Sequence, residues 1–321
     1  MLFLGNSYTF MGNLDEVTLA LFIAAGGEPT SERLAQPGMR FIEHVAEIER
    51  DGSAWQLAFQ SPQDWVFLQE QSQIPGFPDG QTDLVQSQAA AVSLDSSAAA
   101  IGAQTMFVMT WGRREGDSQN PELYPDFLTM QAELAEGYSA YVELASADGT
   151  QAWLAPAGLA WQRVYQDQLD AGADPLTVGG PFHSLYIEDG SHPSERGTYL
   201  TALVIYTSVT GLSPVGLPAP ASITDAAYLQ SVAAEVVLSG EGVDYPWETD
   251  EDTGGDSGGV DDTAADDTDA TTQRRPTQAR PPTRRPRPTR EAAAAPRRPP
   301  PRACGRGWLS LWAAAPGGLI V

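Results

Sequence analysis

Residues 2–10 read LFLGNSYTF, a short apolar run that ends abruptly in Gly5, Asn6 and Ser7. A continuous apolar segment of this length predicts a strand covered on both faces, because a half-exposed strand alternates apolar with polar residues. Small polar residues directly after such a strand are typical of the carboxyl edge of a parallel sheet, where open α/β folds place their sites. The stretch therefore predicts an α/β fold with the Ser7 side chain at that edge.

The first 247 residues repeat this pattern. Strands are expected at residues 1–5, 31–35, 65–68, 105–112 and 151–158. Helices are expected at residues 13–27, 39–52, 83–103, 124–149 and 195–211. Strands that alternate with helices predict a parallel sheet with helices on both faces. The expected fold is a flavodoxin-like three-layer α/β/α sandwich around a parallel five-stranded sheet.

The rest of the chain has a different composition. Residues 248–273 are an acidic linker rich in Gly, Thr and Asp, and residues 274–321 are a tail rich in Arg and Pro. Neither buries enough apolar surface to offset its ordering entropy, so both are expected to be disordered. Two interpretations of the Arg/Pro tract stay open: it binds an acidic surface, or it is the product of a shifted reading frame.

Charge and composition exclude several function classes. Residues 1–247 carry 7 Arg, no Lys and 31 acidic residues, a net charge of −24. Such a domain repels phosphate backbones, which argues against nucleic-acid binding. No stretch approaches the roughly 18 apolar residues of a membrane span. Cys304 is the single cysteine, so no disulfide or Cys metal site forms within one chain.

The compartment stays open. Met1 already lies inside the first expected strand. Export to the periplasm or the extracellular space is expected if a leader precedes Met1, and a cytoplasmic location otherwise.

A histidine suited to activate Ser7 lies in the segment EDGSHP. His192 follows Asp189 by three residues and precedes the last expected helix. A serine hydroxyl is a weak nucleophile until a base takes its proton, and a carboxylate that fixes the tautomer of that base assists it. The fold brings both segments to one sheet edge, so Ser7, His192 and Asp189 predict a catalytic triad that needs no metal or cofactor. By contrast, His183 is expected in a loop beside the site, and His44 at the surface of its helix.

GNSYT near the N-terminus and DGSHP near residue 190 together resemble the SGNH, or GDSL-type, hydrolases. These are serine esterases and acylhydrolases on a flavodoxin-like fold, and the resemblance spans roughly residues 1–215. It implies that Ser7 is the nucleophile, His192 the general base and Asp189 the residue that orients it. The chain also has LQEQS and TWG, a combination shared with one branch of SGNH-like proteins.

The resemblance further implies an oxyanion hole with three donors. Two are the backbone N–H groups of Ser7 and Gly38. The third in the family is an Asn side chain of a Gly-x-Asn-Asp motif, where this chain has QEQS at 69–72, so Gln71 takes the Asn position. Asn6 stands where the family usually has Asp, at a position that supports the turn.

Trp111 and Arg113 follow the fourth expected strand and are candidates for substrate binding. Arg113, with the adjacent Arg114, would hold an anionic group through paired hydrogen bonds, although a salt bridge within this acidic domain fits equally well. Trp111, with Tyr124 and Trp161, would stack on a sugar or pack in the core.

These features predict a serine esterase that removes an acetyl or other short acyl group from a carbohydrate or another polar molecule. Two alternatives stay open. A lipid acylhydrolase requires a broad apolar cleft, and a non-catalytic module would bind a glycan on the same fold. The expected partner is a small-molecule or glycan ester, and the sequence does not fix the oligomeric state.

Overall fold

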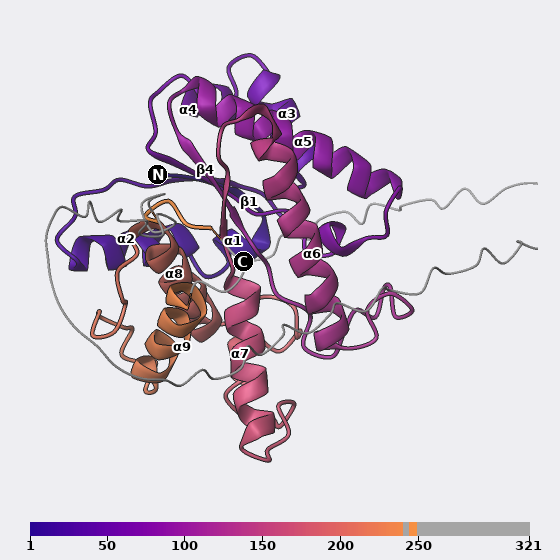
Figure 1. The fold of residues 1–321 in the computed structure, drawn as a ribbon, viewed down its shortest axis with the longest axis vertical. Coiled ribbons are helices and arrows are strands. Elements are labelled where there is room, and N and C mark those ends of the chain that lie inside the picture. The colour runs from indigo at the N-terminus through magenta and orange to yellow at the C-terminus, as the bar shows by residue number, and fades with distance from the viewer. Residues whose placement is uncertain (240–243, 249–321) are drawn as a thin grey trace, which may run out of the picture. The chain divides into compact units, whose positions relative to one another are not determined.

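The computed structural model describes residues 1–239 and 244–248, where five strands form one parallel sheet between two layers of helices (Figure 1). The strands are β1 (Leu2–Gly5), β2 (Glu32–Ala35), β3 (Trp65–Leu68), β4 (Gln104–Val108) and β5 (Trp153–Ala155). Their order in the sheet is β2-β1-β3-β4-β5, and every neighbouring pair is parallel. The expected flavodoxin-like α/β/α fold is confirmed.

The two faces of the sheet bury different side chains of the same strands. Leu2 and Leu4 of β1 pack in one apolar core, whereas Phe3 between them packs in the other. In β3, Val66 and Phe67 are divided in the same way. Side chains of a strand alternate between faces, so a strand covered on both sides has apolar residues at every position.

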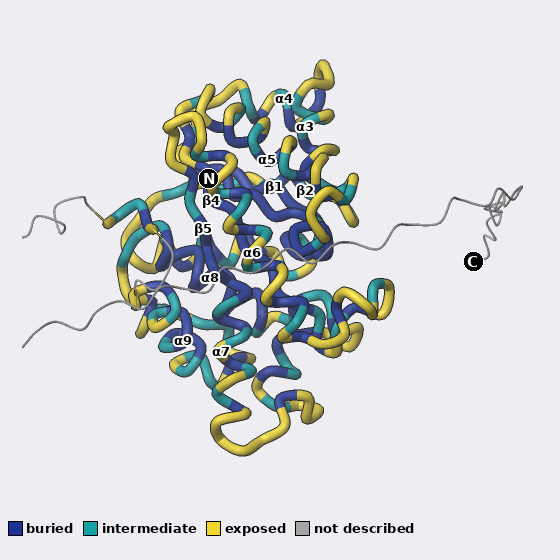
Figure 2. Tube along the Cα trace, turned by 45° about the vertical axis from the view of Figure 1, so that its right-hand side comes forward, coloured by how far each residue is buried: buried dark blue, intermediate teal, exposed yellow. Residues whose placement is uncertain are grey.

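Helices cover both faces, as Figure 1 shows. One layer contains α3 (Phe41–Glu49), α4 (Ala54–Ala58), α5 (Thr82–Ala100) and α6 (Phe127–Ala145). The other contains α2 (Leu14–Ala24), α7 (Ala157–Asp170), α8 (Glu195–Thr210) and α9 (Ala226–Leu238). The central strands β1 and β3 and most of α8 are buried, whereas the edge strand β2 is only partly buried and many connecting loops are exposed (Figure 2). The single turn α1 (Ser7–Phe10) and the short 3-10 helices η1 (Ile74–Gly76), η2 (Ser146–Asp148) and η3 (His183–Leu185) lie between these elements.

The structure differs from the sequence expectation in where two strands end and in three helices that were not expected. β4 ends at Val108, so residues 109–112 lead out of the sheet instead of extending the strand. β5 ends at Ala155 and α7 begins at Ala157, inside the strand expected over 151–158. Helices α4, α7 and α9 were not expected from the sequence. Apart from Glu248, the expected linker at 248–273 and tail at 274–321 lie outside the described residues. Within the described part of the chain, no helix combines the length and apolar character needed to cross a membrane.

Candidate active site

The turn after β1 places Ser7 at the carboxyl edge of the sheet. β1 ends at Gly5, and Asn6 caps the helical turn α1 by accepting a hydrogen bond from the Tyr8 N–H (3.1 Å). A Cβ atom on Gly5 would lie 2.2 Å from Thr9 Oγ1 and 2.7 Å from Gln69 Oε1. The same Gln69 oxygen accepts from the Asn6 N–H at 3.0 Å. A larger residue than glycine would clash at position 5. Glycine therefore allows the tight turn after β1 that makes Ser7 the first residue of α1.

A second loop carries His192 to the same place. Gly190 has φ +68°, in the left-handed region, and lets the chain reverse between Asp189 and His192. Asp189 Oδ1 accepts from the backbone N–H groups of Ser191 (2.9 Å) and His192 (3.0 Å). Ser194 then caps α8 by accepting from the Gly197 N–H. The loop is thereby fixed from both sides of the histidine.

Ser7, His192 and Asp189 form one line of hydrogen bonds. His192 Nε2 lies 2.8 Å from Ser7 Oγ, and His192 Nδ1 lies 2.6 Å from Asp189 Oδ2. A carboxylate only accepts, so the proton of the neutral imidazole resides on Nδ1 and leaves Nε2 to accept from the serine hydroxyl. The His192 side chain is 26% exposed, which keeps the group open to solvent.

The charge of Asp189 is maintained by its partners. Partial burial raises the pKa of this carboxyl, but the hydrogen bonds from the His192 ring and from the N–H groups of Ser191 and His192 outweigh burial and hold its pKa below the ordinary value. Asp189 is therefore ionised at neutral pH and suited to stabilise a positively charged imidazole.

The two backbone donors predicted for the oxyanion hole are unpaired in the part of the chain that the structure describes. Among the described residues, neither the Ser7 N–H nor the Gly38 N–H donates a hydrogen bond. The Asn6 side chain donates to the Met39 carbonyl (3.1 Å) and so ties the residue before Ser7 to the residue after Gly38. Unpaired N–H groups at an exposed site are suited to bind a developing oxyanion.

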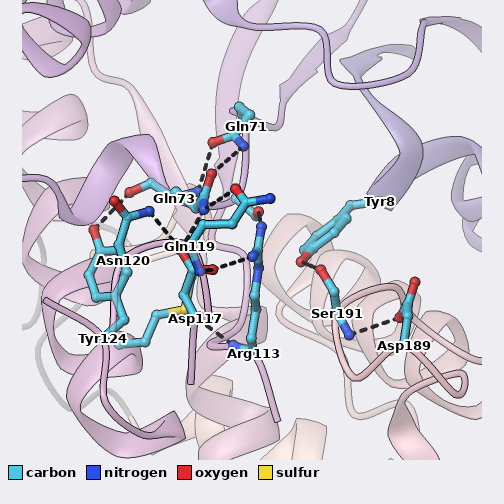
Figure 3. Close-up of polar contacts among 12 residues, drawn as sticks. Tyr8, Gln71, Gln73, Arg113, Asp117, Gln119, Asn120, Tyr124, Asp189 and Ser191 are labelled. Atoms are coloured by element: carbon cyan, nitrogen blue, oxygen red, sulfur yellow. Dashed lines mark hydrogen bonds and ion pairs between the residues drawn. The ribbon is translucent and has the colours of Figure 1, made fainter. Parts of the chain in front are cut away.

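The predicted third donor, Gln71, is engaged within its own loop (Figure 3). Its Nε2 donates to Gln73 Oε1 (2.9 Å), and its Oε1 accepts from the Gln73 N–H (2.9 Å). One amide hydrogen of Gln71 is left for another acceptor, because a primary amide carries two.

Arg113 is paired with an acid and is not a free cation. Its guanidinium contacts Asp117, a side chain with no exposed surface, and donates weakly to Ser72 Oγ (3.5 Å). Asp117 also accepts from Gln73 and Asn120 (Figure 3). Burial raises the pKa of Asp117, but these hydrogen bonds and the Arg113 charge lower it below the ordinary value. The pair links the Arg113 loop to the Gln71 loop and leaves little net charge for an anion.

Arg114 supports the His192 loop. It donates to the carbonyls of Ile187 (3.4 Å) and Glu188 (3.3 Å), and its own N–H donates to the Gly190 carbonyl (2.8 Å). A salt bridge to Glu115 completes its contacts. These contacts favour a structural role for Arg114, as a salt-bridge partner, over the binding of an anionic substrate group.

Of the two interpretations left open for Trp111, the structure supports packing in the core and not stacking on a sugar. Its ring is 2% exposed and stacks on Trp161 (centroids 4.0 Å apart) and Tyr8 (5.0 Å). Its Nε1 donates to the Ser191 carbonyl (3.1 Å). Trp111 and Trp161 pack in the core, and Tyr124 is also buried. Through its hydrogen bond to Ser191, Trp111 supports the loop that precedes His192.

His44 was placed at a helix surface from the sequence, and this was wrong. It is fully buried, with Nε2 against the Gly5 carbonyl (3.1 Å) and Nδ1 accepting from Trp55 Nε1 (2.8 Å). Burial lowers the pKa of His44 to about 4, so the ring is neutral and braces the end of β1. His183, expected in a loop, begins the short 3-10 helix η3, and its Nδ1 lies 3.5 Å from the Gly179 nitrogen.

A polar pocket of about 250 Å³ adjoins the triad loop. Its walls include Arg113, Tyr124, Asp189 and Ser191. It is therefore positioned to receive a polar group next to His192.

Comparisons with known proteins find similarity only among solved structures. No family model and no curated protein matches the chain. A DUF4886 family protein from Bacteroides uniformis is 17% identical, with a TM-score of 0.56, over 74% of this chain and 93% of its own. A candidate SGNH hydrolase from Slackia heliotrinireducens is 28% identical, with a TM-score of 0.49, over 64% of this chain and 95% of its own.

A third similar structure is a variant of an acetyl-xylooligosaccharide esterase from Geobacillus, 16% identical with a TM-score of 0.41, over 64% of this chain and 89% of its own. The match to the DUF4886 family protein supports the fold already assigned from the sheet order.

Proposed function

We propose that the protein is a serine esterase that hydrolyses acetyl or other short-acyl esters of a carbohydrate or another polar molecule. The observation that carries the proposal is the unbroken line from Ser7 Oγ through His192 to Asp189 Oδ2, with distances of 2.8 and 2.6 Å. Such a line provides a nucleophile, a base within reach of its proton, and an acid that orients the base.

In the proposed reaction, Ser7 Oγ attacks the ester carbonyl while His192 Nε2 takes its proton. The tetrahedral oxyanion is bound by the Ser7 and Gly38 N–H groups and, at the predicted third position, by the remaining amide hydrogen of Gln71. Collapse of this intermediate breaks the ester bond, and His192 returns the proton to the departing alcohol. Water then attacks the acyl-enzyme through the same steps, releasing the acid and restoring Ser7. The reaction requires no metal or cofactor.

The polar pocket supports a polar substrate. We assign the departing alcohol to this pocket, because it adjoins Asp189 and Ser191 and has a volume of only about 250 Å³. The Arg113 guanidinium and the Tyr124 hydroxyl in its walls are already paired, with Asp117 and the Gln73 carbonyl. A pocket of this size with polar groups in its walls fits a sugar or another small polyol better than a lipid chain. The lipid acylhydrolase alternative therefore ranks lower.

The non-catalytic alternative also ranks lower. A glycan-binding module needs neither a hydroxyl within 2.8 Å of His192 nor an acid behind it. It would retain ligand binding after Ser7→Ala, because the serine hydroxyl would contribute at most one hydrogen bond.

Hydrolysis of p-nitrophenyl esters by the full chain tests the proposal. We expect activity on the acetyl and butyryl esters that falls with acyl length, and a loss of at least about 10⁴-fold in Ser7→Ala and His192→Ala. Acetylated xylo-oligosaccharides would then test the polar alcohol. Equal rates for wild type and Ser7→Ala in folded protein would exclude the esterase. A preference for long acyl chains would favour the lipid acylhydrolase.

A further inference from the structure

Glu70 is a completely buried carboxyl group that the proposed reaction does not use. It follows β3 by two residues, beside the predicted oxyanion donor Gln71. Carboxyl groups are almost never fully buried unless they are paired or hydrogen-bonded, so the contacts of Glu70 require an explanation.

One oxygen of Glu70 joins two loops that are far apart in sequence. Oε1 accepts from the backbone N–H of Phe41 (3.0 Å) and from the backbone N–H of Gln71 (2.6 Å). Oε2 lies within reach of the Phe41 N–H (3.2 Å) and accepts from Ser87 Oγ. Phe41 begins α3 directly after the loop that contains Gly38. The Oε1 atom of Glu70 thus links the end of the loop that contains Gly38 to the loop that contains Gln71.

We propose that Glu70 is a positioning residue that fixes the two loops of the oxyanion hole relative to each other before substrate binds. The inference rests on the proposed function, because Gly38 and Gln71 are oxyanion donors only in an esterase. Donors of an oxyanion hole are effective when they are already in place, since no energy is then spent on moving them during the reaction. A misplacement of about 1 Å can cost 10²-fold in rate.

The hydrogen bonds that Glu70 accepts from the Phe41 and Gln71 N–H groups are called the bridge below. The surroundings of Glu70 indicate that this bridge persists whether the carboxyl group is ionised or protonated. Three further titratable groups face it: Tyr138 and Tyr141 of α6, and Arg40 before α3, which is itself paired with Glu43 and Asp83.

Burial raises the pKa of Glu70 to about 7, although the hydrogen bonds from Ser87, Gln71 and Phe41 and the Arg40 charge act in the opposite direction. When Oε2 is protonated, Ser87 Oγ can accept that proton while Oε1 still accepts from both N–H groups. An amide with the same shape has the same acceptor, so Glu70→Gln preserves the bridge.

Three variants of the full chain separate positioning from packing. Glu70→Gln keeps the shared acceptor, Glu70→Leu keeps the approximate volume without it, and Glu70→Asp keeps the charge but withdraws the oxygen by one methylene. Asp95→Leu on α5 is the matched control, because Asp95 is another buried acid (2% exposed) that contacts neither loop. Wild type and Ser7→Ala are measured beside them to test the esterase itself.

We expect kcat on p-nitrophenyl acetate to fall about 10- to 100-fold in Glu70→Leu and Glu70→Asp, while KM changes less than about threefold. Glu70→Gln should recover kcat to within about threefold of wild type. Asp95→Leu should lower the unfolding temperature without changing kcat. Unchanged kcat in folded Glu70→Asp, or an equal loss in Glu70→Gln and Glu70→Asp, would overturn the inference.

Hydrogen exchange of the Phe41 and Gln71 amides gives a readout that does not depend on turnover. Faster exchange at both amides in Glu70→Asp, but not in Glu70→Gln, supports the bridge even if Ser7→Ala shows that the chain is no esterase. Unchanged exchange at both amides refutes the bridge even if the esterase is established.

Discussion

The hydroxyl groups of Tyr8 and Ser191 lie 2.6 Å apart (Figure 3). Tyr8 directly follows the proposed nucleophile, and Ser191 directly precedes the proposed base. The two loops are therefore joined by a second hydrogen bond beside the one between Ser7 and His192. The Tyr8 ring also stacks on Trp111, whose Nε1 donates to the Ser191 carbonyl. Aromatic packing and two hydrogen bonds thus hold the base loop against the nucleophile turn.

Tyr8→Phe removes the hydroxyl contact and keeps the ring. A hydrogen bond of this kind contributes a net 0.5–1.5 kcal/mol or so, so we expect kcat to fall about 3- to 10-fold because His192 is held less firmly. Esterase kinetics with p-nitrophenyl acetate measure the effect. Ser191→Ala removes the same contact from the other side and should give a similar loss, and the double variant should lose little more. Independent losses that add in the double variant would refute a direct coupling.

Asp189→Asn should lower kcat far more than it lowers stability. The Asn Oδ1 can still accept from the Ser191 and His192 N–H groups, but its NH₂ group faces Nδ1 and favours the tautomer with the proton on Nε2. That tautomer cannot accept the Ser7 proton, and we expect a loss of about 10³- to 10⁴-fold. Steady-state kinetics and a thermal unfolding curve of the same sample make the comparison. Activity within tenfold of wild type would mean that Asp189 does not orient the base.

Local patterns and topology were sufficient to place Ser7, Asp189 and His192 together, and their role as a catalytic triad stays a prediction. The apolar runs at β1 and β3 indicate strands covered on both faces, and parallel strands bring their carboxyl ends to one edge. Ser7 comes directly after such a strand, and Asp189 and His192 are three residues apart, so their meeting requires only the correct fold. No long-range detail had to be guessed.

Contacts between distant segments explain the errors. His44 has acidic neighbours at Glu43 and Glu47 that suggest a surface helix, yet Gly5 and Trp55 cover it. Trp111 is buried by Trp161, fifty residues further along the chain. Glu70 was treated as one position of a motif, since nothing in the sequence indicates that the Phe41 and Gln71 N–H groups converge on it. A single sequence contains no signal for pairings of this kind.

Gly5→Ala should disrupt the nucleophile turn. The added methyl group would overlap Thr9 Oγ1 and crowd Gln69 Oε1, and overpacking of this kind costs about 1–3 kcal/mol. We expect a lower free energy of unfolding in urea together with a large loss of kcat, because Gln69 also holds the Asn6 N–H. Gly26→Ala is the matched control: its φ is +93° with open space around it, so it should cost about 1 kcal/mol of strain and leave kcat unchanged. Equal effects of the two variants on kcat would contradict the role of the turn.

Glu70 should make stability fall as pH rises from about 4.5 to neutrality. Burial raises its pKa from 4.5 to about 7, so the folded protein holds this proton more tightly than the unfolded chain. The resulting stabilisation is complete below pH 4.5 and is lost as pH rises to about 7. Glu70→Gln has no such proton, so the free energy of unfolding of wild type relative to this variant should decrease across that window and level off above it. Urea unfolding at a series of pH values measures the difference.

In the same experiment, Asp189→Asn tests a group whose contribution to the free energy of unfolding depends on pH in the opposite direction. The pKa of Asp189 is held below its ordinary 3.8, so its stabilisation is present above that pH and is lost only as pH falls below it. The stabilisation that comes from the titration of Asp189 itself should therefore change only below pH 3.8, outside the window of pH 4.5 to 7 in which the difference between wild type and Glu70→Gln changes. A constant difference between wild type and Glu70→Gln across that window would mean that Glu70 titrates near its ordinary pKa in the folded protein, and that its carboxylate is fully compensated by Phe41, Gln71 and Ser87.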